Sequence, residues 1–123
     1  MSITSVKNHL KKYNKDKDII ILNESSATVL EAANALNTLP ERIAKTISLK
    51  NGEDKIMLIL MAGNMKLDNA KFKNTFGFKP RMLNKEEALI HTGHPVGGIC
   101  PFGLKEEADI YLDISLKKYD IIF

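Results

Sequence analysis

The spacing of apolar residues predicts an alternation of helices and strands along the chain. Between Ile3 and Tyr13 they recur at steps of three and four with lysines between them, which predicts an amphipathic helix over 3–13. Residues 19–22, Ile-Ile-Ile-Leu, are a short β-branched run typical of a buried strand. The beginning of the chain is therefore expected to supply one helix and one strand.

Capping residues mark three further helical segments. Thr28 is followed three places later by Glu31, a capping-box pattern that predicts the start of a helix. Segments 68–77 and 84–93 each open on Asp or Asn as a helix N-cap and close on glycine. A short helical turn is expected at 38–41, where a proline is tolerated in the first turn.

Two neighbouring segments are predicted to pair as an antiparallel hairpin. Residues 43–50 alternate apolar and polar, as in a half-buried strand, whereas 56–61 are apolar on both faces and indicate a central strand. The Asn-Gly dipeptide at 51–52 between them is a strong hairpin signal. Residues 78–83 look extended but contain a proline, which excludes a central position, and 110–114 are predicted to form another strand.

The order of these elements predicts a single α+β domain over residues 1–123, with a mixed, mostly antiparallel central sheet flanked by helices. One more strand is expected to begin at 119–123. The chain is 44% hydrophobic but has no apolar run of the roughly 18 residues that a membrane span needs, and its first residues lack the apolar core of a signal peptide. We therefore expect a cytoplasmic location, with which the single cysteine, Cys100, agrees.

The charge of the chain permits a partner that carries phosphate groups. Its formal net charge is +3, and most of the basic residues are lysines. They gather in two segments, 7–17 and 66–81. Such clusters are either solvated faces or surfaces that guide an RNA backbone, and the sequence alone leaves both readings open.

Lys45 is an anomaly within the predicted strand 43–50. The period of two places it on the same face as three apolar residues, Ile43, Ile47 and Leu49. Burying an unpaired ammonium is costly. This lysine must therefore extend to the rim of the sheet, form an ion pair, or point into a polar cleft.

A second anomaly is the segment 91–103, which holds four of the chain's 7 glycines and two of its 4 prolines. Glycine allows positive φ and close approach of a ligand, while proline fixes φ. Positions 97–100 offer consecutive backbone N–H groups, and Pro101 ends the run. Such amides suit a carbonyl oxygen, an oxyanion or a phosphate, although a plain connector with two turns would have a similar composition.

No metal or cofactor site is expected. The spacing of His91, His94 and Cys100 matches no common zinc pattern. Nucleotide-binding glycine motifs and the nucleophile elbow of serine hydrolases are also missing from the sequence. Cys100 could act as a nucleophile with His94 as its base, but a small and partly buried residue is the preferred interpretation.

Four segments, 31–36, 43–47, 60–64 and 92–103, resemble in this order the motifs of the YbaK/prolyl-tRNA synthetase-associated domain family. The resemblance spans nearly the whole chain. It implies an editing domain that hydrolyses the ester of a wrongly charged tRNA, typically alanyl- or cysteinyl-tRNA for proline. The functional signature of the family, a lysine and a G-x-x-x-P loop, corresponds here to Lys45 and to Gly97 through Pro101, which are the two anomalies described above.

The resemblance also implies roles for individual residues. The amides of Gly98, Ile99 and Cys100 are expected to bind the aminoacyl carbonyl, while Lys45 anchors the terminal phosphate or ribose of the acceptor end. The residues expected to contact the substrate or shape its pocket are Thr28, Gly63, Asn64, His94 and Phe102. The expected partners are mischarged tRNA and prolyl-tRNA synthetase, and both a monomer and a dimer are compatible with the sequence.

Two other functions stay open at this point. One is a tRNA- or RNA-binding module with the same fold and no turnover, and the other is a cysteine-dependent hydrolase. The chain looks short for the family, whose members are expected to continue about thirty residues beyond Phe123. A missing terminal strand would expose a sheet edge, which favours the binding module or pairing with another chain.

Overall fold

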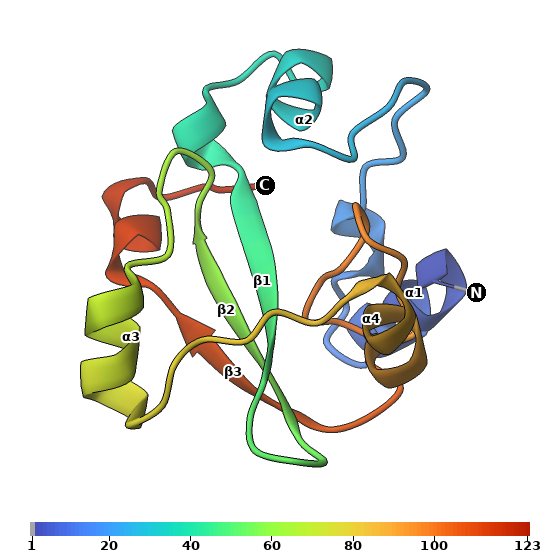
Figure 1. Cartoon of the computed structure of the whole chain (residues 1–123). Coiled ribbons are helices and arrows are strands. Elements are labelled where there is room, and N and C mark those ends of the chain that lie inside the picture. Colours follow the sequence, from blue (N-terminus) through green and yellow to red (C-terminus); the bar gives the residue numbers. More distant parts are fainter. Residues whose placement is uncertain (1) are drawn as a thin grey trace.

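The computed structural model, which describes residues 2–123, contains a three-stranded sheet with helices packed around it (Figure 1). The elements in chain order are α1 (Ser2–Lys11), η1 (Asp16–Asp18), α2 (Val29–Ala35), η2 (Pro40–Arg42), β1 (Ala44–Lys50), β2 (Ile56–Ala62), α3 (Asn69–Phe76), α4 (Lys85–Thr92), β3 (Ala108–Leu112) and η3 (Ile114–Lys118), where η marks a 3-10 helix. The strand order is β1-β2-β3, with β2 antiparallel to β1 and parallel to β3. The predicted α+β class and mixed sheet are confirmed.

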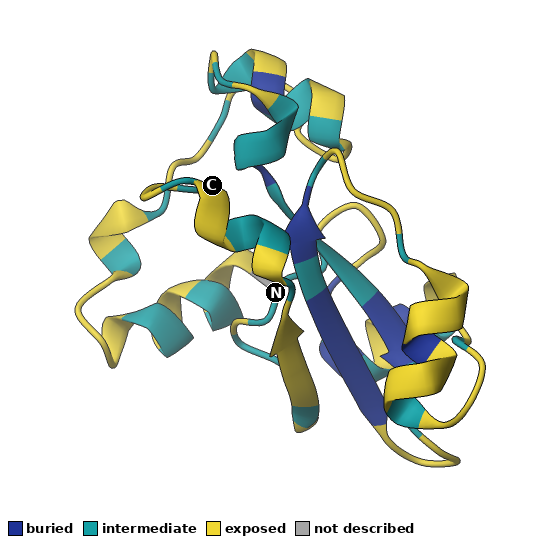
Figure 2. Cartoon of the chain, turned by 90° about the vertical axis from the view of Figure 1, so that its left-hand side faces the viewer, coloured by how far each residue is buried: buried dark blue, intermediate teal, exposed yellow. Residues whose placement is uncertain are grey.

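The hairpin between β1 and β2 forms as predicted. Its register pairs Lys50 with Ile56 beside the connecting loop and Ala44 with Ala62 at the other end. Gly52 in the loop has φ +88°, a conformation that glycine adopts without strain. Because β2 lies between the other two strands, nearly all of it is buried, which accounts for its continuous run of apolar residues (Figure 2).

One face of the hairpin packs against α3. Leu49, Met57 and Phe72 meet there in a buried cluster, and the Phe72 ring lies 4.6 Å from the ring of Phe76. The helix begins where the Asp68 side chain accepts a hydrogen bond from the Lys71 amide, and it ends at a left-handed glycine, as the sequence predicted. The buried Phe72 ring and the partly buried Phe76 ring thus join the aliphatic side chains of the hairpin in one apolar cluster.

The opposite face packs against α4. Asn84 and Glu87 form the predicted capping box, and Ala88 on this helix is buried against Ile56 and Leu83. The extended segment that precedes α4 runs beside β1, where the Leu83 amide donates to the Ser48 carbonyl at 3.0 Å. The expectation that this segment is extended and not central in the sheet is therefore confirmed.

α1 is fastened to the distal end of the glycine-rich segment. The Gly103 amide donates to Nδ1 of His9 at 2.9 Å, and a Cβ on Gly103 would lie 2.5 Å from backbone atoms of Ser5. The backbones thus approach more closely than a side chain would allow. None of the helices among residues 2–123 has the length and apolar composition that crossing a membrane would require.

The predicted strand at 19–22 is wrong. These residues form no strand, and Ile20 and Ile21 are 57% and 67% exposed. The edge of β1 that a further strand would join is occupied instead by 81–83 and by Phe123. The β-branched composition of 19–22 favours an extended conformation locally. The segment forms no strand because the edge of β1 that it would join is already occupied.

Near the C-terminus the predicted strand boundaries also need correction. The strand expected at 110–114 lies at Ala108–Leu112, because Asp113 ends it and caps η3 by accepting from the Ser115 amide. No strand is formed at 119–123. Phe123 nevertheless makes two backbone hydrogen bonds at the start of the hairpin: its amide donates to Arg42 at the end of η2 at 2.8 Å, and its carbonyl accepts from Ala44, the first residue of β1, at 2.7 Å.

Replacing Gly63 by alanine should destabilise the fold more than the same change at Gly77. A Cβ on Gly63 would meet the Pro40 carbonyl and lie 2.5 Å from Cγ1 of Val29, so backbone must move, at a cost of about 2–3 kcal/mol. Gly77 has φ +83° but open space around it, so Gly77→Ala should cost only about 1 kcal/mol. Urea unfolding of both variants measures the difference, and equal losses would contradict it.

Candidate functional site

A cavity of about 470 Å³ lies where the two anomalous segments of the sequence meet. Its walls come from residues 26–29 and α2, from β1, and from the glycine-rich loop at 97–100. A larger cavity of about 600 Å³, between His9 and the segment 104–110, contains only Pro101 of the predicted site residues. Volume alone does not identify a site, so we assign the smaller cavity, which brings Lys45 and the loop together.

The loop is built around a tight turn at its tip. The Gly98 amide donates to the Pro95 carbonyl at 2.9 Å, and Gly97 has φ +94°, as the third residue of a type II turn requires. The expectation that the Gly98 amide binds the aminoacyl carbonyl is therefore corrected, because this amide already has an acceptor. The amides of Ile99 and Cys100 have no acceptor within residues 2–123 and remain available for a ligand.

His94 holds the loop from behind. Its side chain is fully buried, and Nε2 lies 2.7 Å from the Phe102 carbonyl oxygen. The backbone of His94 is held in turn, since its amide donates to the Thr92 hydroxyl. Its lack of exposed surface argues against the predicted contact with the substrate, and its hydrogen bonds instead join Thr92 and Phe102 within the segment 91–103.

Cys100 lines the cavity as a thiol. Burial raises the pKa of this thiol, and a hydrogen bond with the backbone of Phe102 offsets the effect only in part. Sγ lies 3.7 Å from Nε2 of His94. A carbonyl only accepts hydrogen bonds, so Nε2 must carry a hydrogen in order to bond Phe102, and it cannot also take the proton of the thiol. The geometry thus disfavours Cys100 as a nucleophile.

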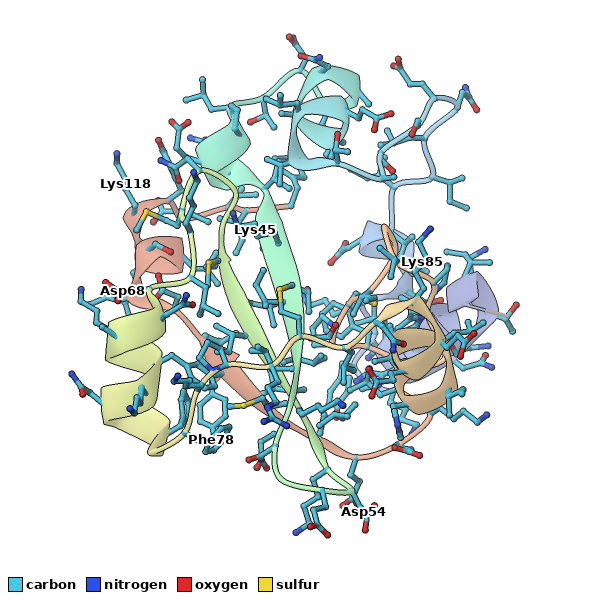
Figure 3. All side chains as sticks on the ribbon, viewed as in Figure 1. Lys45, Asp54, Asp68, Phe78, Lys85 and Lys118 are labelled. Carbon is cyan, nitrogen blue, oxygen red and sulfur yellow. The ribbon has the colours of Figure 1, made fainter. Side chains whose placement is uncertain are left out.

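Lys45 borders the cavity at the end of the sheet opposite to the hairpin loop, which Asp54 marks in Figure 3. Its ammonium donates to the carbonyl oxygens of Gly63, at 3.3 Å, and of Met65. Burial lowers the pKa of Lys45, and the nearby charge of Lys66 lowers it further. No carboxylate within residues 2–123 forms an ion pair with it. The lysine is thus satisfied by backbone carbonyls while keeping its charge at the site.

The other predicted contact residues divide into two groups. Thr28 lines the cavity, but its hydroxyl already bonds Glu31 twice, donating to Oε1 at 3.0 Å and accepting from the amide at 3.1 Å. Gly63, Asn64 and Phe102 are not among the lining residues. Gly63 adjoins the site through its carbonyl and its contact with the α2 wall, while the Phe102 ring faces His9 at 5.6 Å.

Thr46 and Ser48 are cavity residues that sequence reasoning missed. They alternate with Lys45 along β1 and therefore lie on the other face of the strand. The pattern had suggested that this polar face meets solvent, yet Ser48 is only 5% exposed. Small hydroxyl residues at every second position were the available signal, because a solvent-facing strand more often carries long charged side chains.

No metal site is found in the described part of the chain, where no three His, Cys, Asp or Glu side chains gather. The residues considered from the sequence have other partners. His91 pairs through Nδ1 with Glu106 at 2.7 Å, and His94 bonds the Phe102 carbonyl. None of the side chains that the described residues contribute to the cavity wall is Asp, Glu or His.

Comparisons with known proteins agree with one another. A profile of the aminoacyl-tRNA editing domain matches residues 23–123. The uncharacterized protein YwhH of Bacillus subtilis is 45% identical over 123 residues, which is 100% of this chain and 78% of YwhH. The proline–tRNA ligase of Trichlorobacter lovleyi is 32% identical over 91 residues, which is 73% of this chain but 16% of the ligase.

A solved structure extends the comparison to three dimensions. The crystal structure of a candidate trans-editing enzyme for prolyl-tRNA synthetase superposes with a TM-score of 0.85 at 29% identity, covering 96% of this chain and 75% of that one. The likeness therefore extends over nearly the whole of this chain.

The Cys100 thiol should be alkylated slowly in the folded protein. Because burial raises its pKa, the thiolate fraction near neutral pH is below that of an ordinary cysteine. Iodoacetamide should thus react more slowly with the folded chain than with the chain in urea, and the pH midpoint should lie above the usual value of about 8.5. Rapid reaction at pH 7 with a lower midpoint would restore the nucleophile hypothesis.

Proposed function

The chain belongs to the aminoacyl-tRNA editing domain family, and from this premise we propose that it is an aminoacyl-tRNA deacylase. The observation that supports the proposal is the meeting of Lys45 with the free amides of Ile99 and Cys100 around one cavity. The proposed substrate is a tRNA for proline that carries a wrong amino acid, alanine or cysteine. The proposed partners are this tRNA and prolyl-tRNA synthetase, in the cytoplasm, and the reaction needs no cofactor.

An aminoacyl ester is already activated, so its hydrolysis needs position and charge stabilisation more than a strong nucleophile. The amides of Ile99 and Cys100 bind the ester carbonyl and stabilise the oxyanion that forms when water attacks the carbonyl carbon. The bond to the ribose oxygen then breaks, and that oxygen takes up the proton which the attacking water loses. The products are a free amino acid and the uncharged tRNA.

Lys45 supplies positive charge for the acceptor end of the tRNA. It lies close enough to Lys66 for their repulsion to lower its pKa, and neither lysine forms an ion pair within residues 2–123. A phosphate bound here would reduce this repulsion and stabilise both ammonium groups. The carbonyls of Gly63 and Met65 hold the Lys45 ammonium in place before the substrate arrives.

One observation favours the second candidate, a tRNA-binding module without turnover. The side chains lining the cavity include no Asp, Glu or His from the described residues, so none of these common general bases contacts the substrate there. Deacylation by water alone, or by a hydroxyl or thiol of the substrate, does not require one. Single-turnover hydrolysis separates the two functions, whereas tRNA binding does not.

Replacing Lys45 by alanine should slow deacylation by about 10²-fold or more, because one charged contact to the bound substrate is lost. Single-turnover hydrolysis of mischarged tRNA measures the effect. Lys73→Ala, which removes an exposed lysine from α3, is the matched control and should retain the wild-type rate. A folded Lys45→Ala variant with a normal rate would contradict this role and would show that Lys45 only stabilises the Gly63–Met65 turn.

Replacing Gly97 by alanine should impair deacylation more than conservative side-chain changes within residues 94–102. The new Cβ would lie 3.1 Å from the Ala27 Cβ in the cavity wall, and φ +94° is strained for alanine. Both effects shift the amides of Ile99 and Cys100.

The control is Gly77→Ala, which has the same type of φ strain, outside the cavity wall and without the contact to Ala27, and should keep the wild-type rate. Rates are compared at equal folded fractions on alanyl- and cysteinyl-tRNA. A wild type inert on all mischarged tRNAs would overturn the deacylase proposal. A Gly97→Ala variant as fast as wild type would remove the loop from the mechanism.

A further inference from the structure

Ser48 has a hydroxyl group without a hydrogen-bond partner within residues 2–123, although the residue is only 5% exposed. No fully enclosed side-chain oxygen or nitrogen of the described residues lacks a partner. The Ser48 oxygen must therefore reach open space, and the open space that Ser48 borders is the 470 Å³ cavity. This side chain thus presents a polar atom to whatever occupies the cavity.

The surroundings of Ser48 hold it in place and leave its hydroxyl unmatched. Its backbone carbonyl accepts from the Leu83 amide at 3.0 Å, which fixes the strand beside the segment that leads to α4. Leu83 and Ile99, both in the same cavity wall, are apolar. Because this hydroxyl has no partner in the described part of the fold, it can hydrogen-bond a ligand atom in the cavity without giving up an internal contact.

The proposed mechanism assigns a position to each polar group of the substrate except the side chain of the amino acid. The amides of Ile99 and Cys100 take the ester carbonyl, and Lys45 takes the phosphate or ribose. The ammonium of the amino acid finds no carboxylate among the lining residues of the described chain, so it stays hydrated at the mouth. The group that remains to reach the inner wall, where Ser48 lies, is the side chain of the amino acid.

We propose that Ser48 is a specificity-determining residue that hydrogen-bonds a hydroxyl or thiol on the side chain of the aminoacyl group. The inference rests on the proposed deacylase function and revises its substrate class, since it keeps cysteine, adds serine and disfavours alanine. The cavity then favours seryl or cysteinyl groups over an alanyl group, which would leave the Ser48 hydroxyl unmatched. A site with a buried hydrogen-bonding group discriminates strongly against a ligand that lacks the complementary atom.

The test uses amides that the protein cannot hydrolyse readily, seryl and alanyl 3′-amino-3′-deoxyadenosine, and measures their binding by calorimetry. The wild type should bind the seryl amide about tenfold more tightly or better, as expected for one hydrogen bond in a buried site. Ser48→Ala should remove this preference. Thr4→Ala, which removes an exposed hydroxyl from α1, should keep it. A wild type without the preference, or a Ser48→Ala variant that retains it, overturns the proposal.

Thermal unfolding supplies a second readout. If Ser48 has no partner in the fold, Ser48→Ala should have an unchanged or higher melting temperature, whereas a clear decrease would show a structural role and contradict the proposal. Failure of the two proposals can be told apart. A wild type that selects the seryl amide but hydrolyses no ester refutes the deacylase and supports Ser48. A wild type that hydrolyses alanyl, seryl and cysteinyl esters equally supports the deacylase and refutes the role of Ser48 in specificity.

Discussion

The register between β1 and β2 is the constraint on which the rest of the structure depends. Pairing Ile47 with Ile59 places the apolar residues of both strands against α3, and the same register turns Thr46 and Ser48 toward the opposite face. Because side chains alternate with a period of two, a slip by one residue would exchange these faces. A single hairpin thus determines both the core and the cavity.

Close approach of backbones builds the rest of the site from segments distant in the sequence. The turn after β2 contacts η2 and α2 at Gly63, where no side chain would fit, and its carbonyls hold the ammonium of Lys45. On the other side of the cavity, the loop contacts the segment before α2 at Gly97. Two glycines therefore set the distance between the walls, and the lysine is placed as a consequence of the same packing.

Features with local causes could be predicted from the sequence. The caps at Asp68 and Asn84 depend on residues three positions apart, and the hairpin depends on its own turn. The strand expected at 19–22 failed because pairing depends on which sheet edges are free, a property of the whole fold. The buried position of Ser48 was missed for the same reason, since alternation indicates opposite faces but not what covers each.

The loop shows where local reasoning could have gone further. Gly97 as the third residue of a type II turn directs the Gly98 amide back to Pro95, and the order Pro-x-Gly-Gly permits this inference from turn chemistry alone. The turn uses the Gly98 amide as a donor, and the next two amides, on Ile99 and Cys100, have no acceptor in the described part of the chain. Under the proposed function, the ligand is bound by backbone atoms whose direction depends on φ at Gly97 and on the buried His94. The side chains that follow the turn are consequently less important to this binding than its geometry.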